Sequence, residues 1–195
     1  MSTFQLFKRR LELDTEILPF ECGIADLNDF LLEDAKPHLE ARLAVTYLFE
    51  SEDVTAAYYS VLNDSLDYSS FLKYDSDTIR AMKEKFCSIQ SKFPSEKSYW
   101  QYPAVKIGRF AIHEDFQNAK LGRRIMDDII ESFTNKNKTG CAFITVDALN
   151  IGDNKGRKAI GFYGKLGFSF LTKKDKKNHT SFDVSSFVIS RLEAF

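Results

Sequence analysis

Cysteine is scarce in this sequence of 195 residues, which contains only Cys22, Cys87 and Cys141. Three scattered thiols argue against a disulfide scaffold or a zinc site, and they are typical of a reducing compartment. Long apolar runs are lacking as well, so the pattern predicts no membrane-spanning helix. The first residues also lack the features of a secretion signal. We therefore expect a cytoplasmic protein that uses no metal.

Neither sign of charge is in excess, because 27 Lys and Arg residues face 28 Asp and Glu residues. The resulting net charge of -1 argues against a general attraction to nucleic acid. A local attraction stays open for the lysines between Lys173 and Lys177, joined by Lys8, Arg9 and Arg10. These side chains form either an edge for nucleic-acid phosphates or, as the balanced charge favours, an ordinary solvated surface.

The hydrophobic pattern predicts a mixed α/β architecture, and the length fits one domain spanning residues 1–195. Expected strands lie near residues 4–13, 44–49, 54–62, 104–113, 142–148, 168–171 and 182–189, and the second and third form a hairpin. Expected helices lie near residues 27–31, 121–133 and 159–166. A polar stretch with Pro37 ends the first helix, Gly167 ends the last, and a loop runs from Asn150 to Gly156.

Residues from about 69 to 100 differ from the rest of the chain in character. They include a highly charged helical pattern at 78–86. The stretch is too short to bury a core of its own. We interpret it as an insertion between two strands of the sheet.

The segment between the strand at 104–113 and the helix at 121–133 carries the most informative residues. It contains Gln117, Asn118, Ala119, Lys120, Leu121, Gly122, Arg123 and Arg124. A helix start leaves backbone amides unpaired and bears a partial positive charge, so it attracts anions. Gly122 permits close approach of a ligand, and the basic side chains add positive charge. A pyrophosphate fits this segment, although a polar loop before a helix is also a common structural feature.

This segment resembles the Gln/Arg-x-x-Gly-x-Gly/Ala element of the GNAT acyltransferase superfamily, which binds the pyrophosphate of coenzyme A. Lys120 stands where that element has its first glycine. A second resemblance lies one strand downstream, in the order expected for the superfamily. Its Ala-x-x-Phe-Tyr-x-x-x-Gly-Phe signature is similar to the residues Ala159, Phe162, Tyr163, Gly167 and Phe168.

The resemblance implies a GNAT-like fold, with a mixed central sheet flanked by helices, and an acetyl-CoA-dependent N-acyltransferase. It implies that Gln117, Asn118, Ala119, Lys120, Leu121, Gly122 and Arg123 bind the pyrophosphate. It also implies that backbone amides of Phe110, Ala111 and Ile112 pair with the pantetheine arm and polarise the thioester carbonyl. By the same resemblance, Tyr163 is the catalytic acid that returns a proton to the leaving thiolate. The alternative for Tyr163 is a core aromatic residue at helical spacing.

Direct transfer to a primary amine is expected, because no His and Asp pair is spaced to activate Cys22 or Cys141 as a nucleophile. The general base is not singled out by the sequence. His113, Glu114 and Asp147 lie nearest to the expected cleft, and an amine with a lowered pKa needs no dedicated base.

A further resemblance concerns the acceptor. The segments Phe20–Gly23 and Leu27–Leu31 resemble the opening of GNAT-type toxins of toxin–antitoxin modules, and Gly108–Ile112 resembles their Gly-Arg-Leu-Ala-Val strand. Those toxins acetylate the amino group of aminoacyl-tRNA. The implied partners are acetyl-CoA, tRNA, a small antitoxin and a second copy of the chain. A small-molecule or protein amine is the alternative acceptor, and Lys120 leaves open a non-catalytic module that binds CoA or a protein.

Overall fold

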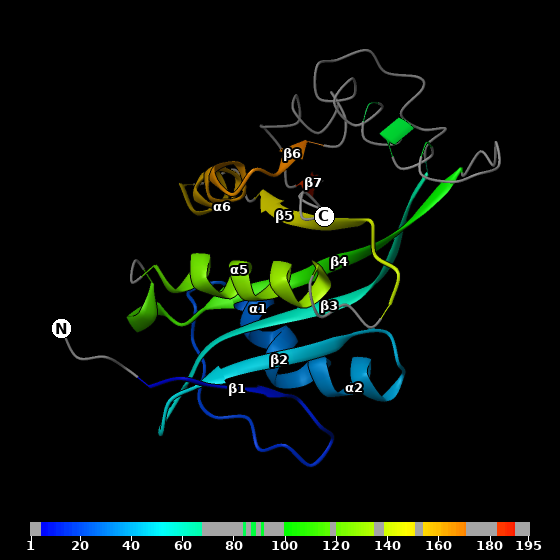
Figure 1. Ribbon diagram of the computed structural model, residues 1–195. Helices are drawn as coiled ribbons and strands as arrows, with labels where there is room; N and C mark the ends of the chain where they lie inside the picture. Colours follow the sequence, from blue (N-terminus) through cyan, green and yellow to red (C-terminus); the bar gives the residue numbers. More distant parts are fainter. Residues whose placement is uncertain are drawn as a thin grey trace. The chain divides into compact units, whose positions relative to one another are not determined.

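The computed structural model describes residues 5–67, 84, 87–88, 91, 100–117, 120–134, 139–150, 154–170 and 183–189. Contacts divide the chain into two compact units. The first contains Met1–Asn63 and Ile107–Glu131, and the second contains Asp64–Lys106 and Ser132–Phe195. Two long strands, β3 (Thr55–Asp67) and β4 (Gln101–Ile112), contribute to both units (Figure 1). Most of the insertion expected at about 69–100, and the lysines from Lys173 to Lys177, lie outside the described residues.

The first unit contains strands β1 (Phe7–Arg10) and β2 (Val45–Glu50) followed in the sheet order by β3 and β4. Both β1 with β2 and β2 with β3 are antiparallel, and Tyr47 of β2 pairs with Tyr59 of β3. The amide of Ser51 donates to the carbonyl of Val54 at 3.0 Å and closes the turn between β2 and β3. The hairpin predicted from the sequence is thus confirmed.

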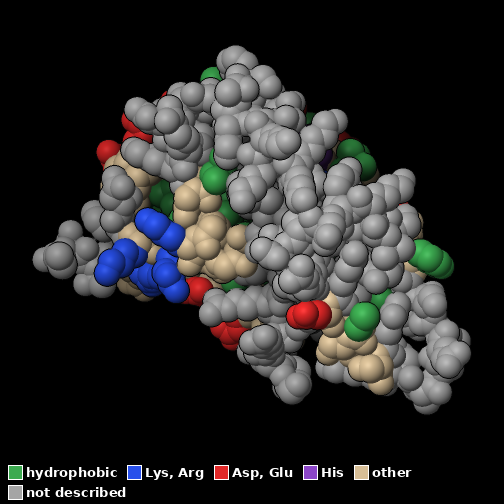
Figure 2. All heavy atoms as spheres, turned by 90° about the horizontal axis from the view of Figure 1, so that it is seen from above, with side chains coloured by type: hydrophobic (Ala, Val, Ile, Leu, Met, Phe, Trp, Pro, Cys, Tyr) green, Lys and Arg blue, Asp and Glu red, His purple; other side chains and the backbone are tan. Residues whose placement is uncertain are grey.

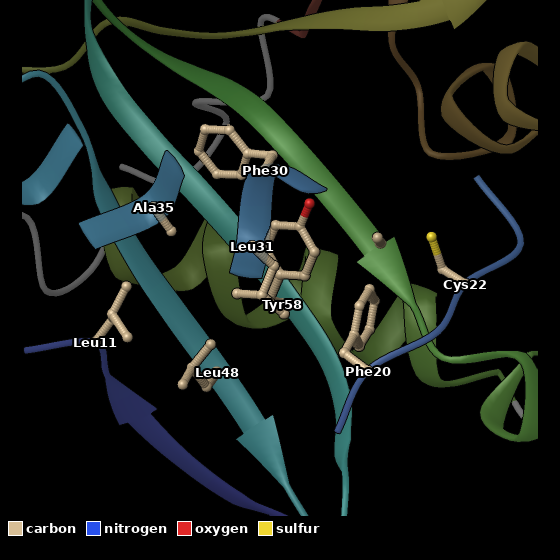
Figure 3. Packing of buried hydrophobic residues seen from close by; sticks show 9 residues of the cluster. Leu11, Phe20, Cys22, Phe30, Leu31, Ala35, Leu48 and Tyr58 are labelled. Atoms are coloured by element: carbon tan, nitrogen blue, oxygen red, sulfur yellow. The ribbon is translucent and has the colours of Figure 1, made fainter. Parts of the chain in front are cut away.

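Three short helical segments cover one face of this sheet. They are α1 (Ala25–Asp29), the π-type turn η1 (Phe30–Asp34) and α2 (Ala35–Glu40). Their apolar side chains enter a buried cluster to which β2, β3 and β4 contribute Leu48, Tyr58 and Ala111. The full cluster consists of Leu11, Phe20, Cys22, Phe30, Leu31, Ala35, Leu48, Tyr58 and Ala111 (Figure 3). Burial of this apolar area is the main force that holds the helical segments on the sheet.

The predicted break of this helix at Pro37 is wrong, because α2 contains that proline. Pro37 occupies the first turn of α2, where the absent N–H and the fixed φ angle of proline are tolerated. The preceding turn η1 is of the wider π type, and it separates the backbone hydrogen bonds of α1 from those of α2. Sequence periodicity alone does not detect such a change of helical pitch.

Helix α5 (Leu121–Thr134) lies on the opposite face of the first unit. Lys8 of β1 forms an ion pair with Asp128 of α5, and its ammonium lies 5.0 Å from the ring centroid of Tyr47 and 5.5 Å from that of Tyr59. Tyr47 and Tyr59 alternate along their strands with Leu48 and Tyr58, which face α1 and η1. The predicted apolar stripe of α5 is confirmed by its buried residues Leu121, Ile125, Met126 and Ile129.

In the second unit, β4 is followed in the sheet by β5 (Phe143–Asn150), β7 (Asp183–Ile189) and β6 (Ser169–Phe170). Strand β7 pairs antiparallel with both β5 and β6. The buried rings of Tyr102 and Phe143 pack edge to face with centroids 6.0 Å apart. The Thr145 hydroxyl donates to the Asp64 carboxylate at 2.6 Å, which fastens β5 to the end of β3.

The loop expected from Asn150 to Gly156 is only partly correct, because helix α6 begins at Asn154 and ends at Lys165. The first residues of α6 are polar, so they carry none of the apolar periodicity that marks its later turns. Within the residues that the structure describes, no helix is both long and apolar enough to cross a membrane. The same residues contain no group of His, Cys, Asp and Glu side chains able to hold a metal ion.

Candidate functional site

The end of β4 is held on one face by packing and along one edge by β3. Ala111 is 5% exposed and belongs to the cluster under α1 and η1. Phe110 and Ile112 alternate with it and are half-buried. Beyond the strand, the amide of His113 donates to the carbonyl of Ala56 at 2.9 Å, so β3 supports β4 to its last residue. These are the residues that the sequence assigns to the pantetheine arm.

Arg109 connects β4 to the helical segments above it. Its guanidinium lies 5.1 Å from the ring centroid of Phe30, and its Nε lies 3.8 Å from the carboxylate of Asp26. Another Arg109 nitrogen donates to the carbonyl of Gly108 at 3.0 Å. The Gly-Arg-Phe-Ala-Ile stretch therefore carries the contact between the strand and α1.

Lys120 adopts the backbone conformation that a glycine favours, with a φ of 58°. This is the left-handed region, which side chains other than glycine enter at a steric cost. The carbonyl of Lys120, the residue just before α5, accepts the first hydrogen bond of the helix, 3.3 Å long, from the amide of Arg124. The GNAT element has a glycine at this position, and glycine adopts a positive φ without strain. Lys120 adopts the same backbone conformation although it carries a side chain.

The start of α5 has the electrostatics of an anion site. Lys120, Arg123 and Arg124 are exposed, whereas Leu121 and Gly122 are buried in the first turn. No acidic residue lies in this first turn. Figure 2 shows Lys and Arg side chains gathered in one group on the face that it presents. Unpaired amides and basic side chains at a helix start attract phosphate groups. Asn118 and Ala119, also assigned to the cofactor, lie outside the described residues.

Gln117 makes internal contacts with both its backbone and its side chain. Its backbone amide donates to the carbonyl of Glu114 at 3.2 Å, at the end of the short helix η2 (Glu114–Phe116). Its side-chain amide donates to the carbonyl of Ile112 at 3.0 Å and to that of Cys22 at 3.2 Å. The sequence predicts a contact with the cofactor for Gln117 and gives no sign of these bonds to distant carbonyls.

Tyr163 lies in the last turn of α6, in a position set by the end of the helix. Gly167 has a φ of 86°, its amide donates to the carbonyl of Gly164 at 3.1 Å, and the amide of Phe168 donates to that of Tyr163 at 3.1 Å. This pair of bonds is a Schellman motif. The ring of Tyr163 packs edge to face against Phe168 and against Phe162. The Phe-Tyr-x-x-x-Gly-Phe signature therefore also encodes a helix end.

The hydroxyl of Tyr163 stays protonated at neutral pH. The side chain is 6% exposed, and burial raises its pKa well above the usual value for tyrosine. A buried, neutral phenol is able to donate a proton and unsuited to act as a base.

The base candidates have different surroundings. Asp147 accepts a hydrogen bond of 2.9 Å from the ammonium of Lys106, with which it forms an ion pair. The Nδ1 atom of His113 accepts a hydrogen bond of 3.3 Å from the amide of Asp115, which places the proton of a neutral ring on Nε2. Glu114 has an exposed side chain. None of these contacts singles out one residue as the base.

Comparisons with known proteins agree with this geometry. Residues 85–170 match the family model of the acetyltransferase (GNAT) domain. A solved structure of a KacT variant has a TM-score of 0.68 and 23% identity, covering 95% of this chain and 94% of that chain. AtaT complexed with acetyl-methionyl-tRNAfMet has a TM-score of 0.66 and 21% identity, with 95% of both chains covered. AtaTR bound with AcCoA has a TM-score of 0.66 and 19% identity, covering 94% and 92%. No curated protein matches the sequence.

The fold is therefore that of the GNAT acetyltransferases. The fold class expected from the sequence is thus confirmed, and residues 85–170 match the GNAT domain that the sequence motifs resemble.

Proposed function

We propose that this chain moves the acetyl group of acetyl-CoA to the α-amino group of an aminoacyl-tRNA and acts as the toxin of a toxin–antitoxin module. The observation that carries the acceptor is the likeness, over 95% of the chain, to AtaT complexed with acetyl-methionyl-tRNAfMet. The likeness to KacT extends over the same share of the chain. A general GNAT enzyme for small amines shares the cofactor elements, so the acceptor is the part of the proposal that needs a direct test.

The first unit fits the pyrophosphate of the proposed co-substrate. Lys120 turns the backbone into the left-handed region immediately before α5, and the first turn of α5 contains no carboxylate. Gly122 presents no side chain there, and Lys120, Arg123 and Arg124 are exposed. In this proposal the amides at the start of α5 donate hydrogen bonds to the phosphate oxygens, and the basic side chains add positive charge.

The reaction forms a bond between the acceptor nitrogen and the acetyl carbon and breaks the bond from that carbon to sulfur. The acceptor amine must lose a proton before attack, and the leaving thiolate must gain one. Backbone amides near the end of β4 polarise the carbonyl as charge develops on its oxygen. Tyr163 donates its proton to the thiolate, a role that a phenol kept neutral by burial supports.

The partners in this proposal follow from the same likeness. One similar solved structure shows AtaT bound to the C-terminus of the antitoxin AtaR, and another is the KacTA–DNA complex. We propose a small antitoxin protein as the partner of this chain. Its gene is expected beside that of the toxin, and its coexpression is expected to relieve growth arrest.

Purified chain, acetyl-CoA and a mixture of aminoacyl-tRNAs test the acceptor. Mass spectrometry of the hydrolysed aminoacyl ends is expected to show N-acetylated amino acids. Deacylated tRNA and free amino acids serve as matched controls, because they offer the RNA or the amine separately. Thiol release with small amines and none with aminoacyl-tRNA would replace the proposal by a small-molecule acetyltransferase. Binding of CoA without any transfer would favour the non-catalytic module.

A further inference from the structure

A polar network joins α1 to the start of the proposed cofactor loop. We call the stretch from Phe20 to Gly23, which precedes α1, the entry segment. Asn28 of α1 accepts a hydrogen bond of 3.0 Å from the amide of Cys22 and donates one of 2.6 Å to the Glu21 carboxylate. The same carboxylate oxygen accepts a bond of 2.6 Å from the amide of Gly23. One side chain of α1 thus holds the entry segment at two points.

The entry segment is held on its other side by residues that follow β4. The carbonyl of Glu21 accepts a hydrogen bond of 2.9 Å from the amide of Glu114. The carbonyl of Cys22 accepts a bond of 3.2 Å from the side-chain amide of Gln117, which also donates to Ile112 at 3.0 Å. Both hydrogens of one amide group are therefore used to join two chain segments far apart in sequence.

We infer that Gln117 is a positioning residue that couples α1 to the cofactor loop. This inference rests on the proposed function, because it takes the start of α5, just after Gln117, as the CoA-binding element. When CoA binds there, the two bonds of Gln117 restrain the carbonyls of Ile112 and Cys22. The restraint reaches α1 through Glu21 and Asn28. The ligand at one end of the network thereby stabilises the helix at the other end.

The chemistry of the contact explains which side chains fit. Only a donor with at least two N–H groups satisfies both carbonyls, so Gln and Arg fit and Glu does not. Gln117→Glu has the same shape and places one carboxylate oxygen, in the position of Nε2, against both carbonyl oxygens. Gln117→Arg restores donors to the site. In α1, Asn28→Asp retains the acceptor for the Cys22 amide and sets a carboxylate against that of Glu21.

Hydrogen–deuterium exchange with and without CoA tests the inference, and calorimetry measures CoA binding in parallel. In the parent chain, CoA is expected to slow exchange roughly tenfold in peptides covering residues 20–30, the effect of one or two net hydrogen bonds. Gln117→Glu is expected to abolish that slowing, and Gln117→Arg to retain it. Asn28→Asp is expected to abolish it while weakening CoA binding less than Gln117→Glu. A peptide from β2 serves as the control and is expected to be unaffected by any of these changes.

The outcomes separate this inference from the proposed function. CoA binding in the parent without slowed exchange in residues 20–30 would overturn only the coupling. Equal slowing in the parent and in Gln117→Glu would do the same. A loss of slowing in Gln117→Arg as well would show that the site needs the amide shape and not the donors. No CoA binding by the parent would overturn the proposed function and this inference with it.

Discussion

The amide of Phe168 donates a hydrogen bond to the carbonyl of Tyr163, and the two rings pack edge to face with centroids 5.4 Å apart. The residue proposed for proton transfer is therefore also part of the structure that ends α6. The hydroxyl contributes to neither contact. Backbone, ring and hydroxyl are separate features at this position, and each can be changed alone.

Gly167→Ala tests the helix end without altering Tyr163. Gly167 has a φ of 86°, and an added Cβ would meet no atom within 4 Å, so the cost is purely conformational. We expect a loss of about 1 kcal/mol in the free energy of unfolding, measured with urea. Gly164→Ala is the matched control, since its Cβ also meets nothing within 4 Å and its φ is helical. It is expected to stabilise the chain by roughly 0.5–1 kcal/mol, and the opposite order of the two variants would contradict the assignment.

Tyr163→Phe retains the ring and its packing and removes only the hydroxyl. A fall in kcat of roughly a hundredfold, with the KM for acetyl-CoA nearly unchanged, is expected for a lost general acid. Steady-state kinetics at saturating acceptor measure both constants. In cells, the variant is expected to relieve growth arrest. An unchanged kcat would show that Tyr163 is structural.

Lys120→Gly and Lys120→Ala separate backbone strain from charge at the start of α5. Both variants remove the ammonium, but only the glycine variant also removes the conformational strain that a residue with a side chain has at a φ of 58°. The glycine variant is expected to be more stable than the alanine variant by about 1 kcal/mol, measured by chemical unfolding. Equal stabilities would mean that the backbone at this residue relaxes away from the left-handed region.

The same two variants report on cofactor binding. If the ammonium contacts a phosphate, both bind CoA more weakly, by about fivefold for an exposed ion pair of about 1 kcal/mol, and both lose part of the salt dependence. Calorimetry at several salt concentrations measures these effects. If only the loop backbone matters, the glycine variant binds at least as well as the parent. Two variants indistinguishable from the parent would show that the Lys120 side chain points to solvent.

Alkaline pH is expected to destabilise the folded chain through its buried tyrosines. Burial raises the pKa of Tyr58, Tyr59 and Tyr163 in the folded state, whereas an unfolded tyrosine titrates near pH 10. Above about pH 10 the unfolded chain binds fewer protons than the folded one, so the free energy of unfolding falls by up to about 1.4 kcal/mol per pH unit for each tyrosine. Below that range these groups contribute no slope.

Urea unfolding between about pH 9 and pH 11 measures this slope, together with the ultraviolet absorbance of tyrosinate. Tyr59→Phe is expected to remove the contribution of one tyrosine to the pH dependence of the free energy of unfolding. A folded chain whose tyrosines all titrate near pH 10 would contradict the burial.

The sequence predicts the strands, the stripe of α5 and the end of α6 well, because each has a local signature. Alternation marks β2 and β3, the apolar spacing marks α5, and Gly167 marks the Schellman motif. The prediction that Pro37 ends the helix fails because proline is unfavourable only in helix interiors. Pro37 lies in the first turn of α2, which follows the π-type turn η1. The start of α6 is missed because its polar residues form no stripe.

Only part of the candidate site could be predicted from local sequence patterns. A motif shows that position 120 favours glycine, but only the φ of Lys120 explains how a lysine is accommodated there. The bonds of Gln117 to Ile112 and Cys22 join segments that no periodicity connects. Asn28 stands within the toxin-like segment, yet its partners depend on the fold of the entry segment and not on its neighbours in sequence.

The ion pair of Lys8 with Asp128 spans 120 residues of sequence. During synthesis, all residues of the β2–β3 hairpin leave the ribosome before those of α5. The hairpin can therefore form early, because its pairing is local in sequence. The contact of Lys8 with α5 must wait until well over half of the chain has emerged. Every nascent chain that stops before Asp128 lacks the second half of α5, the helix whose start carries the proposed phosphate site. The proposed acyl transfer therefore becomes possible only after most of the chain's own message has been translated.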